Sequence, residues 1–150
     1  MPLPRKKKID EIDRSLLVEP QFSHEERRLY LQGMELFNRR HYWEAHEIWE
    51  ELWKRREEES RIFFQGIIQA AAAFHRIITD PKYTGAINNL EKALQKLQIF
   101  PEQFLGLDVG DLFRRLQAAK DKLVELGPER MRDFPEKLLP TIEFKSSNIR

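Results

Sequence analysis

The sequence predicts an all-α protein, a compact bundle or array of about five helices in which the third helix is central. Three observations carry this prediction. Apolar residues recur at helical spacing, no segment sustains period-two alternation, and the 6 glycines and 8 prolines fall where helices are expected to end. We expect residues 1–22 to form a basic, disordered arm, residues 23–127 the helical domain, and residues 128–150 a short helix with an extended tail.

Capping signals and apolar spacing locate the first three helices. Ser23 and Glu26 form a capping-box pattern at the start of a helix that runs to about Asn38. A second helix is expected over Tyr42–Arg56 and a third over Ser60–Thr79, with its first residue as the cap. The third is apolar on two opposite sides, which predicts that neighbouring helices cover both sides.

Two further helices complete the array. The fourth is expected to start at Asp80-Pro81, and the fifth runs from about Asp108 to Leu126, where Gly127-Pro128 ends it. Inside the first helix, Gly33 costs about 1 kcal/mol of helix propensity relative to alanine. Its presence predicts that another backbone comes close at that point.

The composition is that of a soluble globular protein. The 150 residues suggest one domain that is large enough for an ordinary core. Lys and Arg total 26 and Asp and Glu total 25, and this near balance argues against a dedicated nucleic-acid binder. The absence of cysteine excludes disulfides and thiolate chemistry. No apolar stretch approaches the ~18 residues of a membrane helix, and no secretory signal follows the basic start, so we expect a cytoplasmic protein without membrane contact.

The second and third helices each place a histidine within an apolar stripe. His46 shares its stripe with Trp49, and His75 occupies a similar position on the third helix. Glu50 lies about 40° from His46 on the helical wheel, so the two side chains face the same space. A buried imidazole needs hydrogen-bonding partners. We therefore predict a polar cluster between the two helices, made of His46, Glu47, Glu50, Gln65, Gln69 and His75.

Three hypotheses for this cluster stay open. In the first, the cluster is structural and fixes how the two helices cross. In the second, His46, Glu50 and His75 bind a divalent metal, as in a metal-binding protein or a metal-dependent hydrolase. The zinc-binding motif His-Glu-x-x-His is not present, because Glu50 stands where that motif needs its second histidine. In the third, His46 and Glu50 form an acid–base pair. No residue is assigned a catalytic role, and no cofactor is expected unless the metal hypothesis holds.

A weak sequence similarity between two helices of the chain indicates another function. The stripe Tyr42, Ala45, Trp49 and Leu52 aligns, at an offset of 41 residues, with Tyr83, Ala86, Leu90 and Ala93. This pattern resembles the helix pairs of tetratricopeptide repeats, although those repeats have a 34-residue period and need three or more copies. True kinship would imply a module that binds peptides on a concave face.

Three stretches of the chain carry a family resemblance. They are Gly33–Asn38, Tyr42–Glu50 and Phe63–Ala72, and His75 follows them. Over roughly residues 25–97 they resemble the prokaryotic family called domain of unknown function 309. The resemblance implies a small all-helical domain with no established activity, and both histidines of the predicted cluster lie at matching positions.

The expected function follows from these observations. We expect a non-enzymatic interaction or structural protein that contacts a second copy of itself or another protein. The basic segment Arg5–Lys8 is a candidate for contact with RNA or an anionic surface. No aromatic residue is interleaved there for base stacking, so nucleic acid is not the expected partner.

Overall fold

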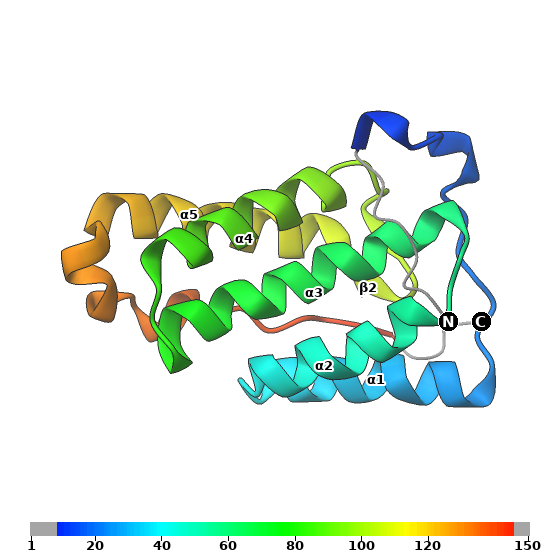
Figure 1. Cartoon of the computed structure of the whole chain (residues 1–150), viewed down its shortest axis with the longest axis horizontal. Coiled ribbons are helices and arrows are strands. Elements are labelled where there is room, and N and C mark those ends of the chain that lie inside the picture. Colours follow the sequence, from blue (N-terminus) through cyan, green and yellow to red (C-terminus); the bar gives the residue numbers. More distant parts are fainter. Residues whose placement is uncertain (1–8, 146–150) are drawn as a thin grey trace.

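The computed structural model describes residues 9–145, and its predominantly helical content confirms the predicted fold class. The five α-helices are α1 His24–Asn38, α2 Tyr42–Lys54, α3 Ile62–Phe74, α4 Tyr83–Leu97 and α5 Val109–Leu126. Each α-helix packs against the next along the chain. Figure 1 shows α3 between α2 and α4, so the predicted central position of the third helix is confirmed.

The start of α1 and its contact with α2 follow from local sequence. The Ser23 hydroxyl accepts a hydrogen bond from the Glu26 N–H at 3.1 Å, and the Glu26 carboxylate accepts one from the Ser23 N–H at 2.9 Å. Gly33 faces Trp49 of α2 so closely that an added Cβ would lie 2.0 Å from the indole nitrogen. That nitrogen donates to the Tyr30 carbonyl at 3.2 Å. The prediction that another backbone comes close at Gly33 is wrong, because the neighbour is the indole ring of Trp49.

The helical segment around α3 starts differently from the prediction. A 3-10 turn, Glu59–Arg61, precedes α3, and a π-helical turn, His75–Thr79, follows it. Ser60 is not the cap, because it lies inside the 3-10 turn, where its hydroxyl is buried without a hydrogen-bond partner among residues 9–145. The predicted start of α4 at Asp80 is also wrong, because the Asp80 N–H still bonds to the His75 carbonyl and Lys82 is the N-cap of α4.

One helical segment of the described chain, Glu59–Thr79, is long and apolar enough to cross a membrane by length and composition. The sequence did not lead us to expect a segment of this kind. In the fold, 72% of its most apolar window is buried, since α2 and α4 pack against it. The burial is that of the core helix of a soluble protein.

A short sheet joins α4 to α5. Its antiparallel strands are β1 Gln103–Phe104 and β2 Leu107–Asp108. Strands of two residues are too short to produce a period-two pattern, which is why the sequence did not predict them. The expected start of α5 is confirmed, because the Asp108 carboxylate accepts a hydrogen bond from the Asp111 N–H at 2.9 Å. Gly127, with φ of 72°, ends α5 as predicted.

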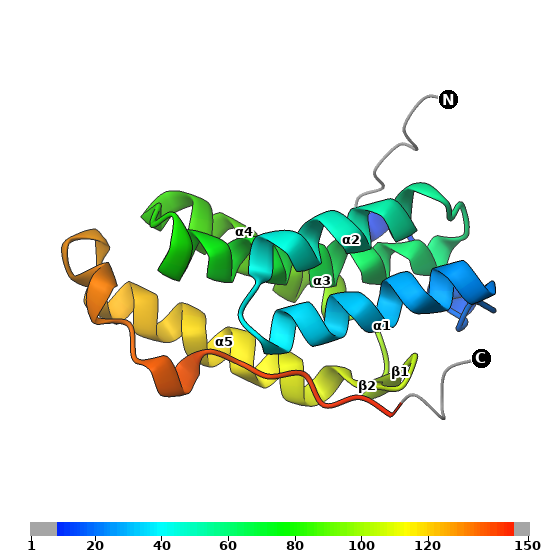
Figure 2. The same ribbon diagram turned by 90° about the horizontal axis from the view of Figure 1, so that it is seen from below.

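The segments before α1 and after α5 lie against the helices. Residues 9–22 contain 3-10 turns at Ile9–Glu11 and Arg14–Leu16, and Phe22 packs against the core. The basic segment Arg5–Lys8 lies outside the described residues. After 3-10 turns at Pro128–Asp133 and Glu136–Leu138, the chain runs extended along α5 (Figure 2).

This extended C-terminal segment is tied to α1. The Asn38 amide donates to the Ile142 carbonyl at 3.0 Å and accepts from its N–H at 2.6 Å. A β-bridge joins Leu107 to Phe144.

Candidate functional site

A hollow of about 190 Å³ lies over α3, between α2 and α4. Four of the predicted cluster residues line it: His46 and Glu50 from α2, and Gln65 and Gln69 from α3. We call this hollow the polar groove. Its complete lining is His46, Glu50, Trp53, Gln65, Ile68, Gln69, Ala72, Asn89 and Lys92. The position of α3 between its two neighbours in Figure 1 shows why α3 forms the floor and α2 and α4 the walls.

Gln65 is the most unusual residue of the floor. Its exposed fraction is 6%, yet its side-chain amide has no hydrogen-bond partner within residues 9–145. The two polar atoms of the amide are not fully enclosed, so the amide opens onto the groove, where water or a ligand can pair with it.

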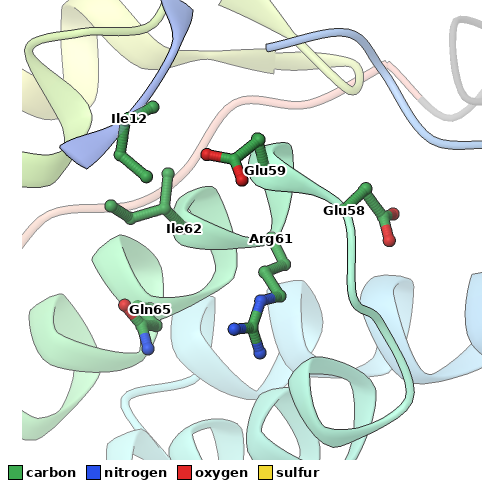
Figure 3. Close-up of a pocket in the computed structure, with 6 residues that line it drawn as sticks. All are labelled: Ile12, Glu58, Glu59, Arg61, Ile62 and Gln65. Carbon is green, nitrogen blue, oxygen red and sulfur yellow. The ribbon is translucent and has the colours of Figure 1, made fainter. Parts of the chain in front are cut away.

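Gln65 also borders a second, much smaller hollow at the N-terminal end of α3. Figure 3 shows this hollow, where Ile12 from the N-terminal segment lies beside Ile62. Its volume of about 10 Å³ holds one water molecule at most. The ring of Trp53, which lines the polar groove, carries the Arg61 guanidinium 5.3 Å from its centroid.

The wall formed by α4 is basic. Lys92 lines the polar groove from an exposed position, and no ion pair of Lys92 is found among residues 9–145. One turn further along α4, the Lys96 ammonium donates a hydrogen bond to the Gln69 amide oxygen at 2.8 Å. The opposite wall carries Glu50, so the groove has one acidic side and one basic side.

Trp43 joins the two histidines of the predicted cluster. Its ring stacks on His46, with centroids 4.5 Å apart and an interplanar angle of 15°, and lies 4.8 Å from the ring of His75. Both imidazoles are half-buried. The Arg76 guanidinium lies 6.0 Å from the Trp43 centroid. Both histidines therefore contact the same indole ring, which is 37% exposed near the N-terminal end of α2.

His75 and Glu47 lie outside the polar groove. His75 lines a separate hollow of about 420 Å³ at the N-terminal end of α2, together with Trp43 and Thr79. Glu47 lies on the exposed side of α2 and lines neither hollow. Four of the six predicted residues therefore line the polar groove, whereas His75 lines the other hollow and Glu47 lies on the surface.

The geometry bears on the metal and acid–base hypotheses. The distance between His46 Nε2 and Glu50 Oε2 is 4.0 Å, longer than the ~2.6–3.2 Å at which a proton is transferred directly. Within residues 9–145, no three His, Cys, Asp or Glu side chains converge as a group that could hold a metal ion. His46, Glu50 and His75 therefore have no common centre on which metal chemistry could be built.

A buried ion-pair cluster lies at the other end of α2. The Arg56 guanidinium bonds to both carboxylate oxygens of Glu26, at 3.0 and 2.8 Å, and lies 2.6 Å from Glu58. Burial raises the pKa of the Glu26 carboxyl, but the hydrogen bonds from the Ser23 N–H and from Arg56 outweigh it, so the net pKa is lowered. This cluster ties the start of α1 to the segment between α2 and α3.

Sequence reasoning missed the contribution of α4 to the site. Asn89, Lys92 and Lys96 lie at i, i+3 and i+7 along α4, and none of them was included in the predicted polar cluster. The spacing of these polar residues was the available signal. It could not be assigned to a groove, because nothing in the sequence says which face of α4 lies beside α3.

Part of the chain is similar to a known protein family. Residues 30–89 match the model of a family described as "Domain of unknown function (DUF309)". Every predicted cluster residue lies inside that range, while Lys92 and Lys96 lie beyond it.

The chain is also similar to an uncharacterized protein of Aquifex aeolicus (strain VF5), with 30% identity over 112 residues. The similarity covers 74% of this chain and 32% of that protein, so the chain spans about a third of the length of its relative. Both comparisons describe proteins without an assigned function. The match of residues 30–89 to this family model confirms the family resemblance.

Proposed function

We propose that this protein is a non-enzymatic binding module that holds an extended segment of a partner protein in the polar groove. The observation that carries the proposal is Gln65, whose side chain is 6% exposed and lines the groove, and whose amide opens onto the groove and has no hydrogen-bond partner within residues 9–145. An amide both donates and accepts, so it can pair with the C=O and N–H groups of an extended backbone. Asn89 offers a second amide from the facing wall.

The size of the groove supports a segment of a larger partner. Its volume of about 190 Å³ is below the ~300–1,000 Å³ of pockets that enclose small-molecule ligands. A groove of this size accommodates one or two side chains of a partner whose backbone crosses it. The arrangement also suits the tetratricopeptide-like alternative, because the helix pairs α1–α2 and α3–α4 pack side by side with α3 as the floor.

The aromatic cluster has a supporting role in this proposal. Trp43 packs between His46 and His75 and fixes how the ends of α2 and α3 cross. His46 also lines the groove, so the same packing sets the position of the α2 wall. The structural hypothesis for the histidines and the binding hypothesis for the groove are therefore compatible.

Selection from a displayed library of random nonapeptides tests the proposal. We expect the wild-type protein to enrich a family of related peptides, and Gln65→Leu to bind synthetic copies at least tenfold more weakly while it melts at or above the wild-type temperature. The fold should tolerate leucine because the amide has no protein partner to lose.

The matched control is Gln32→Leu, at an exposed position of α1 outside the groove, which should bind like the wild type. The proposal is wrong if no peptide family is enriched. It is equally wrong if the enriched peptides bind Gln65→Leu and the wild type alike.

A further inference from the structure

We infer that the segment held in the polar groove carries an acidic side chain that pairs with Lys92 on the α4 wall. This inference rests on the proposed function and names the chemistry of the partner. It is carried by the distribution of charge around the groove, which differs between the two walls.

Lys92 lines the polar groove, and its surroundings differ from those of the lysines that form ion pairs on the surface. Lys82, Lys120 and Lys122 each lie within 4.0 Å of a carboxylate, in contacts of 3.9, 3.6 and 3.3 Å. Lys92 has no such neighbour within residues 9–145, although it borders a hollow that also contains Glu50. Its ammonium is therefore available to a carboxylate that enters the groove.

The facing wall determines where that carboxylate lies. Charge–charge energy falls as the inverse of distance, so a carboxylate about 4 Å from Lys92 and about twice as far from Glu50 is attracted twice as strongly as it is repelled. Lys96, hydrogen-bonded to Gln69, adds positive charge on the same side. The acidic side chain of the partner therefore lies against α4, and its backbone lies over Gln65 and Gln69.

The aromatic residues favour a protein segment over a nucleic acid. Binding of single strands uses open aromatic faces on which bases stack. His46 stacks on the ring of Trp43, and the Arg61 guanidinium lies over the ring of Trp53. Neither indole leaves both faces open, and the wall that carries Glu50 would repel a phosphate backbone that filled the groove.

The experiment compares peptide selections on three full-length proteins: wild type, Lys92→Glu and the control Lys137→Glu. Lys137 is exposed in the 3-10 turn after α5 and lies outside the groove. We expect the wild type and the control to enrich Asp or Glu at one fixed position, and Lys92→Glu to enrich Lys or Arg there. Replacing the acidic residue of a synthetic peptide with its amide should weaken binding to the wild type by roughly two- to fivefold, as for an exposed ion pair.

The possible failures are distinguishable. If peptides are enriched without an acidic position, or if Lys92→Glu selects the same family as the wild type, the acidic partner is refuted and the binding groove stands. If no peptide family is enriched by the wild type, both proposals fall. Binding of a single-stranded oligouridylate that Gln65→Leu abolishes, without peptide enrichment, would assign the groove to nucleic acid and overturn the inference.

Discussion

Replacing Gly33 with alanine should destabilise the protein, although alanine is the better helix former. The added Cβ would lie 2.0 Å from the Trp49 indole nitrogen and 2.4 Å from Cδ1, well inside van der Waals contact. Trp49 is fully buried and donates its N–H to the Tyr30 carbonyl, so the ring cannot move away without losing that bond.

The magnitude follows from three effects. Overpacking a core costs about 1–3 kcal/mol. Loss of the indole hydrogen bond adds about 0.5–1.5 kcal/mol. The gain in helix propensity returns about 1 kcal/mol. We therefore expect Gly33→Ala to lower the free energy of unfolding by about 0.5–3.5 kcal/mol, which corresponds to roughly 1–14 °C in melting temperature for a chain of this length.

Gly85→Ala provides the matched control. A Cβ at Gly85 would meet the side chains of Arg76 and Lys82 at 3.8 Å, an ordinary contact, so this change in the first turn of α4 should stabilise the protein by about 0.5 kcal/mol. Urea unfolding followed by circular dichroism measures both variants against the wild type. If Gly33→Ala unfolds at the same urea concentration as the wild type or a higher one, the argument from the Trp49 contact is refuted.

Four further predictions test the packing and electrostatics of the fold. Tyr30→Phe should lower the free energy of unfolding by about 0.5–1.5 kcal/mol, because it loses the 2.9 Å hydrogen bond to the Leu105 carbonyl. Tyr42→Phe should be neutral or stabilising, because the Tyr42 hydroxyl has no partner among residues 9–145. Equal losses of stability in thermal unfolding would contradict this prediction. Burial raises the pKa of Tyr42 to about 12, so wild-type stability should fall above about pH 10, where tyrosine ionises in the unfolded chain, and Tyr42→Phe should reduce that loss in alkaline urea unfolding. Arg56→Met should lower the free energy of unfolding by about 1–3 kcal/mol at about pH 7. The fold lowers the pKa of Glu26 from 4.5, so the stabilisation from the Glu26 carboxylate is complete above that value and is lost as the pH falls through the folded-state pKa. If the Arg56→Met variant loses as much stability near pH 3 as at pH 7, the ion pair is not the source of the effect. Trp43→Leu should lower stability by about 1–2 kcal/mol through loss of two imidazole contacts, and an unchanged melting temperature would refute the structural role of the aromatic cluster.

The residues of the polar groove show which parts of the site could be predicted from the sequence. The prediction that His46 and Glu50 face the same space followed from their separation on one helix, and both line the groove. Glu47 is the next residue after His46 and was placed in the same cluster, yet it points to the solvent side of α2. Single-helix geometry separates these two glutamates once the buried face is known, and that face depends on the neighbouring helices.

The predicted helix caps likewise include two that the structure confirms and two that it does not. Ser23 and Asp108 cap their helices as predicted, because each cap is a hydrogen bond between residues three apart in the sequence. Ser60 and Asp80 have equally suitable side chains but do not act as predicted. The 3-10 turn before α3 and the π-helical turn after it lengthen this helical segment at both ends, and they depend on how the buried central helix packs.

The sequence by itself determined the helical class, the order of the helices, two of their caps and the resemblance to a family, because each of these depends on residue patterns along the chain. The tertiary structure alone decided that Asn89 and Lys92 line the same groove as Gln65, that His75 lines a different hollow, and that the Gln65 amide has no hydrogen-bond partner among residues 9–145. Those arrangements depend on the rotation of each helix against the next. That rotation is set by the packing of whole helix faces rather than by any local pattern.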